Sequence, residues 1–218
     1  MGRKLPTFAA RMKEKEKIFI GQALQAFLKY GIKSMTMDDL ARHLGMSKKT
    51  IYNYVKDKNE LVERSLAMQF NTEECAVSVI CAKNLNAIDE MFEIGLFISG
   101  MLNEMHPSIH YDLEKYHAEA FHKAKKSHEE HIYKCTVENL KKGMSEGLYR
   151  EDLNAEVIAK IYMTKIDVVF NAELFPPTEI SFNEVYSTMF RYHILGVASM
   201  KGATYLKKKL KSSNTITL

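Results

Sequence analysis

Two short helical segments separated by a three-residue turn constrain this chain most. Thr36 followed by Asp39 predicts the capped start of the first helix, because the hydroxyl accepts from a free backbone N–H and the carboxylate reaches back to the cap. Gly45 predicts its end, since glycine adopts the left-handed conformation without a steric cost. Ser47 predicts the cap of the second helix. So short a turn is typical of a helix-turn-helix, which presents its second helix to the DNA major groove.

The second helix carries side chains suited to DNA on its outer side. Most of them can donate to phosphate oxygens or base edges, whereas Ile51 and Val55 face the apolar side. A further helix opens at Asp57, and its first ammonium group is expected to lie beside a phosphate. The predicted DNA-contacting residues are Thr36, Ser47, Lys48, Lys49, Thr50, Tyr52, Asn53, Tyr54 and Lys58.

This segment resembles the DNA-binding domain of TetR-family bacterial transcriptional regulators. The resemblance covers about the first quarter of the chain, in register and without a gap, and depends on Phe27, Gly31, Thr36, Leu40, Ala41, Gly45, Ser47, Thr50, Tyr52, Lys58 and Leu61. Two positions depart from the family pattern: Lys49 stands where a small residue is common, and Val55 replaces a usual phenylalanine. The resemblance implies a dimeric regulator, most often a repressor, that binds a near-palindromic double-stranded operator.

Charge is distributed unevenly along the 218 residues. Residues 1–60 hold 13 Lys/Arg against 6 Asp/Glu, and residues 61–218 hold 18 against 21. A polyanion-binding surface requires such a basic excess. We therefore predict a DNA-binding domain over residues 1–60 and a helical ligand-binding and dimerisation domain over residues 61–218.

Apolar residues recur at helical spacing throughout, with no alternation typical of strands, so the expected architecture is all-α with about nine helices. The long helix that opens at Asp57 should connect the two domains. Later helices are predicted over residues 87–104, 113–146, 155–174 and 182–210. The last two carry apolar and small residues that favour a homodimer interface.

The family resemblance also implies a cavity lined by the middle helices for a small-molecule effector. Few polar groups lie on the expected walls, so the ligand should be mostly apolar with one or two polar atoms. The candidate lining residues are Phe92, Ile98, Leu102, His117, Phe121, His128 and Tyr162.

Other kinds of site have weaker support. His128, His131 and Cys135 have a spacing that could present metal ligands, yet structural histidines are the favoured interpretation, and we predict no metal and no cofactor. No nucleophile–base pattern or phosphate loop indicates an enzyme. With no long apolar run and no signal-like N-terminus, a cytoplasmic protein with no membrane partner is expected. A ligand-independent dimeric or architectural DNA binder remains the alternative function.

Overall fold

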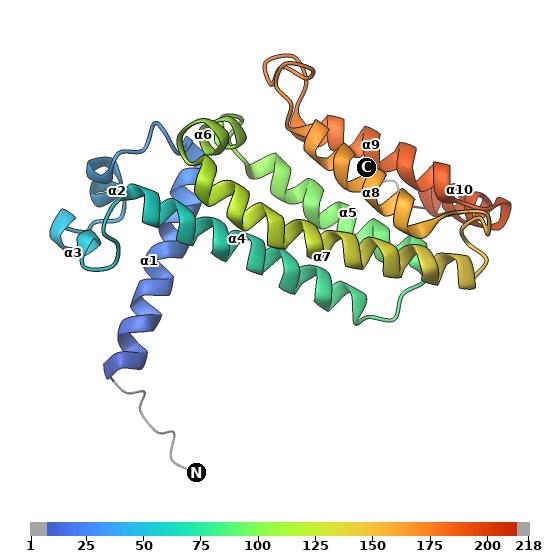
Figure 1. The fold of residues 1–218 in the computed structure, drawn as a ribbon, viewed down its shortest axis with the longest axis horizontal. Helices are drawn as coiled ribbons and strands as arrows, with labels where there is room; N and C mark the ends of the chain where they lie inside the picture. Colours follow the sequence, from blue (N-terminus) through green and yellow to red (C-terminus); the bar gives the residue numbers. More distant parts are fainter. Residues whose placement is uncertain (1–7, 213–218) are drawn as a thin grey trace, which may run out of the picture. The chain divides into compact units, whose positions relative to one another are not determined.

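The computed structural model describes residues 8–212, which fold into helices with no strand among them. The N-terminal residues 1–7, which bear on the predicted lack of a signal segment, lie outside this range. The helices in chain order are α1 (Phe8–Tyr30), α2 (Met37–His43), α3 (Lys48–Tyr52), α4 (Lys58–Cys81), α5 (Ala87–Glu104), α6 (Ile109–Tyr116), α7 (Ala118–Ser145), α8 (Ala155–Val169), α9 (Phe182–Val197) and α10 (Met200–Ser212) (Figure 1). The all-α prediction is confirmed. None of these helices is long and apolar enough to cross a membrane.

The chain divides into two compact units. The first, which we call the head, contains the residues up to 73 together with residues 105–125, and the second, the larger unit, contains residues 74–104 and 126–218. Ile109, Leu113 and Phe121 pack in the same apolar core as α1 to α4. The head is therefore more than the segment predicted over residues 1–60, because α6 and the start of α7 complete its core.

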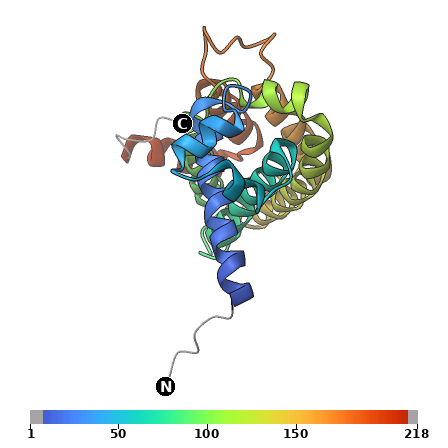
Figure 2. The ribbon, with the colours of Figure 1, turned by 90° about the vertical axis from the view of Figure 1, so that its left-hand side faces the viewer.

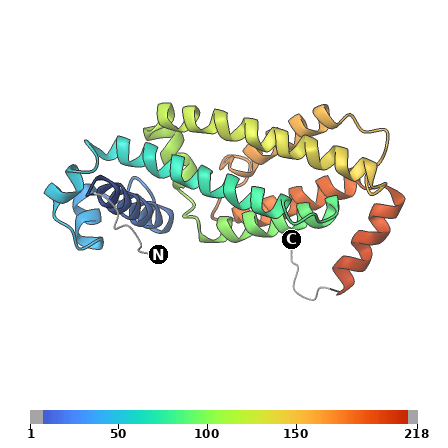
Figure 3. The same ribbon diagram turned by 90° about the horizontal axis from the view of Figure 1, so that it is seen from below.

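The described range contains ten helices, against about nine predicted, and two of the long predicted helices are interrupted. The helix expected over residues 113–146 is interrupted at His117, whose backbone has φ −137° and ψ 31°. The helix expected over residues 182–210 is interrupted between α9 and α10, which differ sharply in direction (Figure 3). In addition, α8 ends at Val169 rather than near residue 174, and the connection to α9 extends beyond both helices (Figure 2).

A buried polar network holds α5 against α7 in the larger unit. The Asn139 amide donates to Glu90 at 2.7 Å and to the carbonyl of Ala87 at 3.0 Å, and it accepts from the Tyr149 hydroxyl at 3.0 Å. Lys142 donates to the second carboxylate oxygen of Glu90 at 2.7 Å. Because each buried polar atom has a partner, the network specifies one arrangement of these elements.

The break between α9 and α10 is held by the chain that follows α7. Ser199 donates its backbone N–H to the carbonyl of Leu148 at 2.9 Å and its hydroxyl to that of Gly147 at 2.8 Å. Tyr149 and Ala198 form an isolated antiparallel bridge. A Cβ on Gly202 would lie 2.0 Å from the carbonyl oxygen of Leu148, so this close approach requires glycine.

Candidate nucleic-acid interface

The helix-turn-helix forms through local signals, as predicted. The Thr36 hydroxyl accepts from the backbone N–H of Asp39 at 3.1 Å, and the Asp39 carboxylate accepts from the N–H of Thr36 at 3.0 Å. Gly45 has φ +63°, the left-handed conformation that ends the first helix. The Ser47 hydroxyl accepts from the N–H of Thr50 at 3.1 Å and so caps α3. Both caps and the turn are confirmed.

Helix α3, the second helix of the motif, buries one side and exposes the other. Ile51 and, just beyond the helix, Val55 are buried in the core of the head. Lys48, Lys49 and Tyr52 are exposed, as is Asn53 at the C-terminal end of α3. The exposed set combines ammonium, phenol and amide donors, which suit phosphates and base edges.

The hydroxyl groups at the two caps are already engaged within the protein. Thr36 exchanges hydrogen bonds with Asp39, and the Ser47 hydroxyl lies 2.8 Å from that of Thr50. Contacts of these three hydroxyls with DNA stay predictions. In the structure, the hydroxyls help to fix the N-terminal ends of α2 and α3.

Tyr54 lies differently from the prediction that it points outwards. Its ring stacks on Phe19 of α1, with ring centroids 5.3 Å apart, and it packs against the core of the head. Its carbonyl accepts from Arg64 of α4 at 2.9 Å. Because the chain leaves α3 at Asn53, Tyr54 no longer shares the outer side of that helix.

Lys58 has a partner within the protein, and its predicted phosphate contact stays a prediction. Its ammonium donates to the carbonyl of Ile32 at 2.6 Å and is half-buried. Burial lowers the pKa of Lys58, while the nearby carboxylates of Asp112 and Asp39 act in the opposite direction. In this arrangement, Lys58 joins α4 to the chain between α1 and α2.

Asp112 of α6 is a structural residue of the head that sequence reasoning missed. Its buried carboxylate accepts from the backbone N–H of Lys33 at 2.9 Å and from the Ser108 hydroxyl at 3.1 Å. Gly31 has φ +83°, and a Cβ there would lie 2.8 Å from the Ser108 oxygen. Thus α6 holds the connection that precedes the helix-turn-helix. In the sequence, only Gly31 indicates an unusual backbone here. The bond between residues 33 and 112 joins positions too far apart for a local pattern to predict it.

The predicted ligand-contacting residues are divided between the two units, and their contact with a ligand stays a prediction. His117 and Phe121 belong to the head, where Phe121 packs edge-on against His110 at 5.3 Å. The Nδ1 atom of His117 is buried without a hydrogen-bond partner, and burial together with the charge of Lys58 lowers the pKa of His117. The other five, which belong to the larger unit, are Phe92, Ile98, Leu102, His128 and Tyr162.

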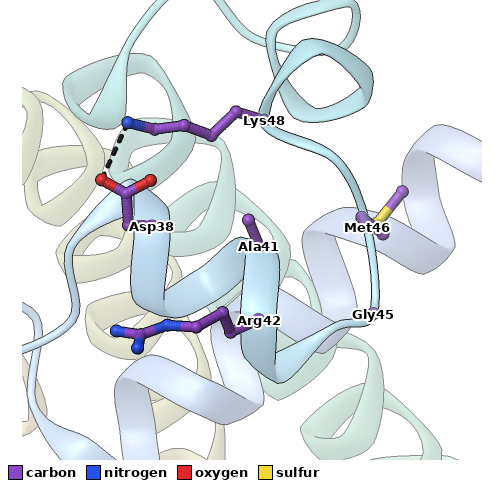
Figure 4. Close-up of a pocket in the computed structure, with 6 residues that line it drawn as sticks. All are labelled: Asp38, Ala41, Arg42, Gly45, Met46 and Lys48. Atoms are coloured by element: carbon purple, nitrogen blue, oxygen red, sulfur yellow. Dashed lines mark hydrogen bonds and ion pairs between the residues drawn. The ribbon is translucent and has the colours of Figure 1, made fainter.

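Within the larger unit these side chains contact different partners. Phe92 packs edge-on against Phe190 of α9 at 5.6 Å, and the ring of Tyr162 lies 4.4 Å from that of His193. His128 lies 3.5 Å from the carboxylate of Glu74. An open depression of about 610 Å³ lies on the head and is lined by Asp38, Ala41, Arg42, Gly45, Met46 and Lys48 (Figure 4).

The predicted alternative of a metal site gains no geometric support. Cys135 lies 3.5 Å from the Nε2 atom of His131 one turn away, whereas His128 faces Glu74. Within residues 8–212, no three His, Cys, Asp or Glu side chains form a group that could hold a metal ion. Burial raises the pKa of Cys135 to about 11, which disfavours the thiolate that metals bind.

Residues 19–64 match the sequence model of bacterial regulatory proteins of the tetR family. This range contains the end of α1, both helices of the motif and the start of α4. The N-terminal segment of this chain therefore carries a tetR-type helix-turn-helix. No curated protein matches the sequence.

Solved structures of transcriptional regulators share the TetR-type fold of this chain. One from Cytophaga hutchinsonii has 17% identity and a TM-score of 0.66, covering 85% of this chain and 99% of its own. SmeT, the repressor of the Stenotrophomonas maltophilia multidrug efflux pump SmeDEF, has 10% identity and a TM-score of 0.64, covering 85% and 91%. A regulator from Saccharomonospora viridis in complex with choline has 13% identity and a TM-score of 0.63, covering 86% and 99%. At these identities the likeness concerns the fold.

Proposed function

We propose that this TetR-type protein is a sequence-specific, dimeric transcriptional regulator that acts in the cytoplasm and has no enzymatic role. The observation that carries the proposal is the exposed side of α3, with Lys48, Lys49, Tyr52 and Asn53, within a segment that matches the tetR family. The excess of Lys/Arg over Asp/Glu in residues 1–60 supports binding to a polyanion.

We assign the homodimer interface to α8 and α9. Val157, Ile161 and Val168 form an exposed apolar stripe on α8, and Tyr192 and Leu195 are exposed on α9. Exposed apolar side chains on two neighbouring helices favour burial against a two-fold copy. The break after α9 limits this face, since Ala203, which the predicted long helix would have included, lies on α10.

We further propose repression that a small-molecule ligand relieves. SmeT is a repressor of the same fold, and the Saccharomonospora viridis regulator of the same fold holds choline, which supports a ligand-responsive function. The alternative, a ligand-independent dimeric regulator, is favoured by the close packing of α5 on α9, where a Cβ on Gly95 would lie 3.0 Å from Phe190. A ligand that binds the larger unit and weakens operator binding would support ligand-relieved repression over the ligand-independent alternative.

The proposed release mechanism is displacement of the two heads of a dimer. They must lie about 34–36 Å apart to enter successive major grooves, so a small rotation would abolish simultaneous binding. Coupling must be reciprocal: operator must weaken ligand binding by the factor by which ligand weakens operator binding. Spin labels at Asn53 in both subunits should report a changed distance distribution with ligand. An unchanged distribution would favour direct competition with DNA instead.

Operator binding is tested by selecting genomic fragments with the purified protein and measuring their affinities against random duplexes. Lys49→Ala should cost about 1–3 kcal/mol on the selected operator and much less on random DNA if Lys49 donates to a guanine. Equal weakening on both would mean that Lys49 contacts phosphate only. If the protein selects no fragment over random DNA, the proposed sequence-specific function is wrong.

The dimer interface is tested by sedimentation of two matched arginine variants. Gly196→Arg places the new side chain on α9 where nothing lies within 4 Å of an added Cβ, so the monomer should tolerate it while the dimer is lost. Ala203→Arg, exposed on α10, should leave the dimer intact. A dimer that survives Gly196→Arg would contradict the assignment.

A further inference from the structure

One ammonium group of the recognition helix is paired with a carboxylate of the preceding helix. The Nζ atom of Lys48 lies 2.8 Å from Oδ2 of Asp38, and the hydrogen bond raises the pKa of Lys48. Both side chains are well exposed, at 48% for Lys48 and 63% for Asp38. Figure 4 shows the lysine extended along the rim of the open depression towards α2.

The pair has little importance for the fold. The neighbouring carboxylate, Asp39, caps α2 and binds Arg42, so Asp38 is not needed for either contact. Exposed ion pairs contribute little to stability because water screens them and two flexible side chains lose freedom. The consequence of the Asp38–Lys48 pair therefore concerns what the head presents to a partner.

The adjacent residue gives an internal comparison. Lys49 is exposed on the same helix, and within the described range its ammonium has no hydrogen bond or ion pair. Two neighbouring cations thus differ in one respect: Lys49 is free for a phosphate or a base, whereas Lys48 is held by an anion that would itself face DNA.

We propose that Asp38 limits the affinity of the head for DNA by holding Lys48 away from the phosphate backbone. The inference rests on the proposed DNA-binding function. For Lys48 to reach a phosphate, its bond to Asp38 must break, and the carboxylate then remains close to the polyanion. Both effects weaken binding to any sequence alike, so Asp38 sets overall affinity and salt dependence rather than base preference.

The test is a double-mutant cycle of the full chain on random duplex DNA over a range of salt concentrations. The variants are Asp38→Asn, Lys48→Gln and the double substitution. Glu63→Gln is the matched control, because it removes one negative charge and breaks an exposed pair of the head with Lys123 at 3.1 Å, away from α2 and α3. Thermal unfolding of each variant shows whether the fold is kept.

Asp38→Asn should tighten binding roughly three- to tenfold at low salt, and the slope of log K against log salt should become steeper by about 0.9, the value for one further phosphate contact. In the Lys48→Gln background the gain from Asp38→Asn should be clearly smaller, because only the repulsion between the Asp38 carboxylate and DNA is then removed, and Glu63→Gln alone should have little effect. Weaker binding by Asp38→Asn, or an equal gain with and without Lys48, overturns the inference while the DNA-binding function stands. A wild-type protein that binds no duplex rejects both.

Discussion

In the head, hydrogen bonds between residues three positions apart fix the ends of α2 and α3, whereas in the larger unit residues 49 to 62 positions apart hold α5 in place. In the first kind of contact, both partners lie within one short stretch of sequence. The second depends on the whole unit being folded. The difference teaches that damage to the helix-turn-helix should remain local, while damage to the network around α5 should affect the entire unit.

The strongest test of this comparison is Gly143→Ala in the larger unit. A Cβ at this position would lie 2.0 Å from Cδ2 of Tyr149, a residue that is only 1% exposed. We expect a loss of about 3 kcal/mol or more in the free energy of unfolding, because the ring and its bond to Asn139 must shift.

The matched control is Gly100→Ala, which places the same methyl group in open space within α5. It should stabilise the protein by about 0.5–1 kcal/mol, because alanine loses less backbone freedom on folding. Denaturant unfolding measures both variants. Similar effects of the two substitutions would mean that the close packing around Tyr149 does not determine stability.

A second test uses pH and the buried His193 of the larger unit. Burial, with the charge of Lys165 nearby, lowers the pKa of His193 from 6.5 to about 4. Since the folded pKa is depressed, the unfolded chain takes up the proton first, and stability falls as pH drops from 6.5 towards 4. Between pH 7 and pH 5 the contribution of this group should fall by about 2 kcal/mol.

His193→Gln removes this titration while keeping a polar side chain. The difference in unfolding free energy between wild type and variant should therefore depend on pH, and it should level off below about pH 4, where His193 is protonated in the folded and the unfolded chain alike. A difference that is constant from pH 7 to pH 5 would show that His193 is not buried in its neutral form.

The smallest expected effect concerns the head. Ser47→Ala removes the side chain that caps α3, and about 1 kcal/mol should be lost. Hydrogen exchange should become faster at the amide of Thr50 and its neighbours in α3, and remain unchanged around Asn139 in α7. Equal acceleration in both places would contradict the separation into local and long-range stabilisation.

The same distinction explains which features could be predicted from sequence. The caps at Thr36 and Ser47, the turn at Gly45 and the burial of Ile51 were all predicted correctly, because each depends on residues within a few positions. The bounds of α5, Ala87–Glu104, were also predicted, since this helix is apolar over most of its length.

The features that sequence reasoning missed depend on distant partners. The bond from Lys58 to the carbonyl of Ile32, 26 positions earlier, was not predicted, and the expected phosphate contact of Lys58 stays a prediction. Tyr54 was expected to face outwards but stacks on Phe19 of another helix. No glycine or proline lies next to the interruption at His117, and the helical spacing of the apolar residues favoured one continuous helix. In each case tertiary packing overrides a local preference.

The interruption between α9 and α10 has a consequence for the order of folding. No glycine or proline stands between Val197 and Met200, so a peptide spanning residues 182–210 alone should form one uninterrupted helix. The bonds that stop it come from Gly147 and Leu148, about fifty positions earlier in the chain. Such long loops close slowly, since their entropy is lost before any contact forms. We therefore expect α10 to acquire its direction only once the end of α7 is in place.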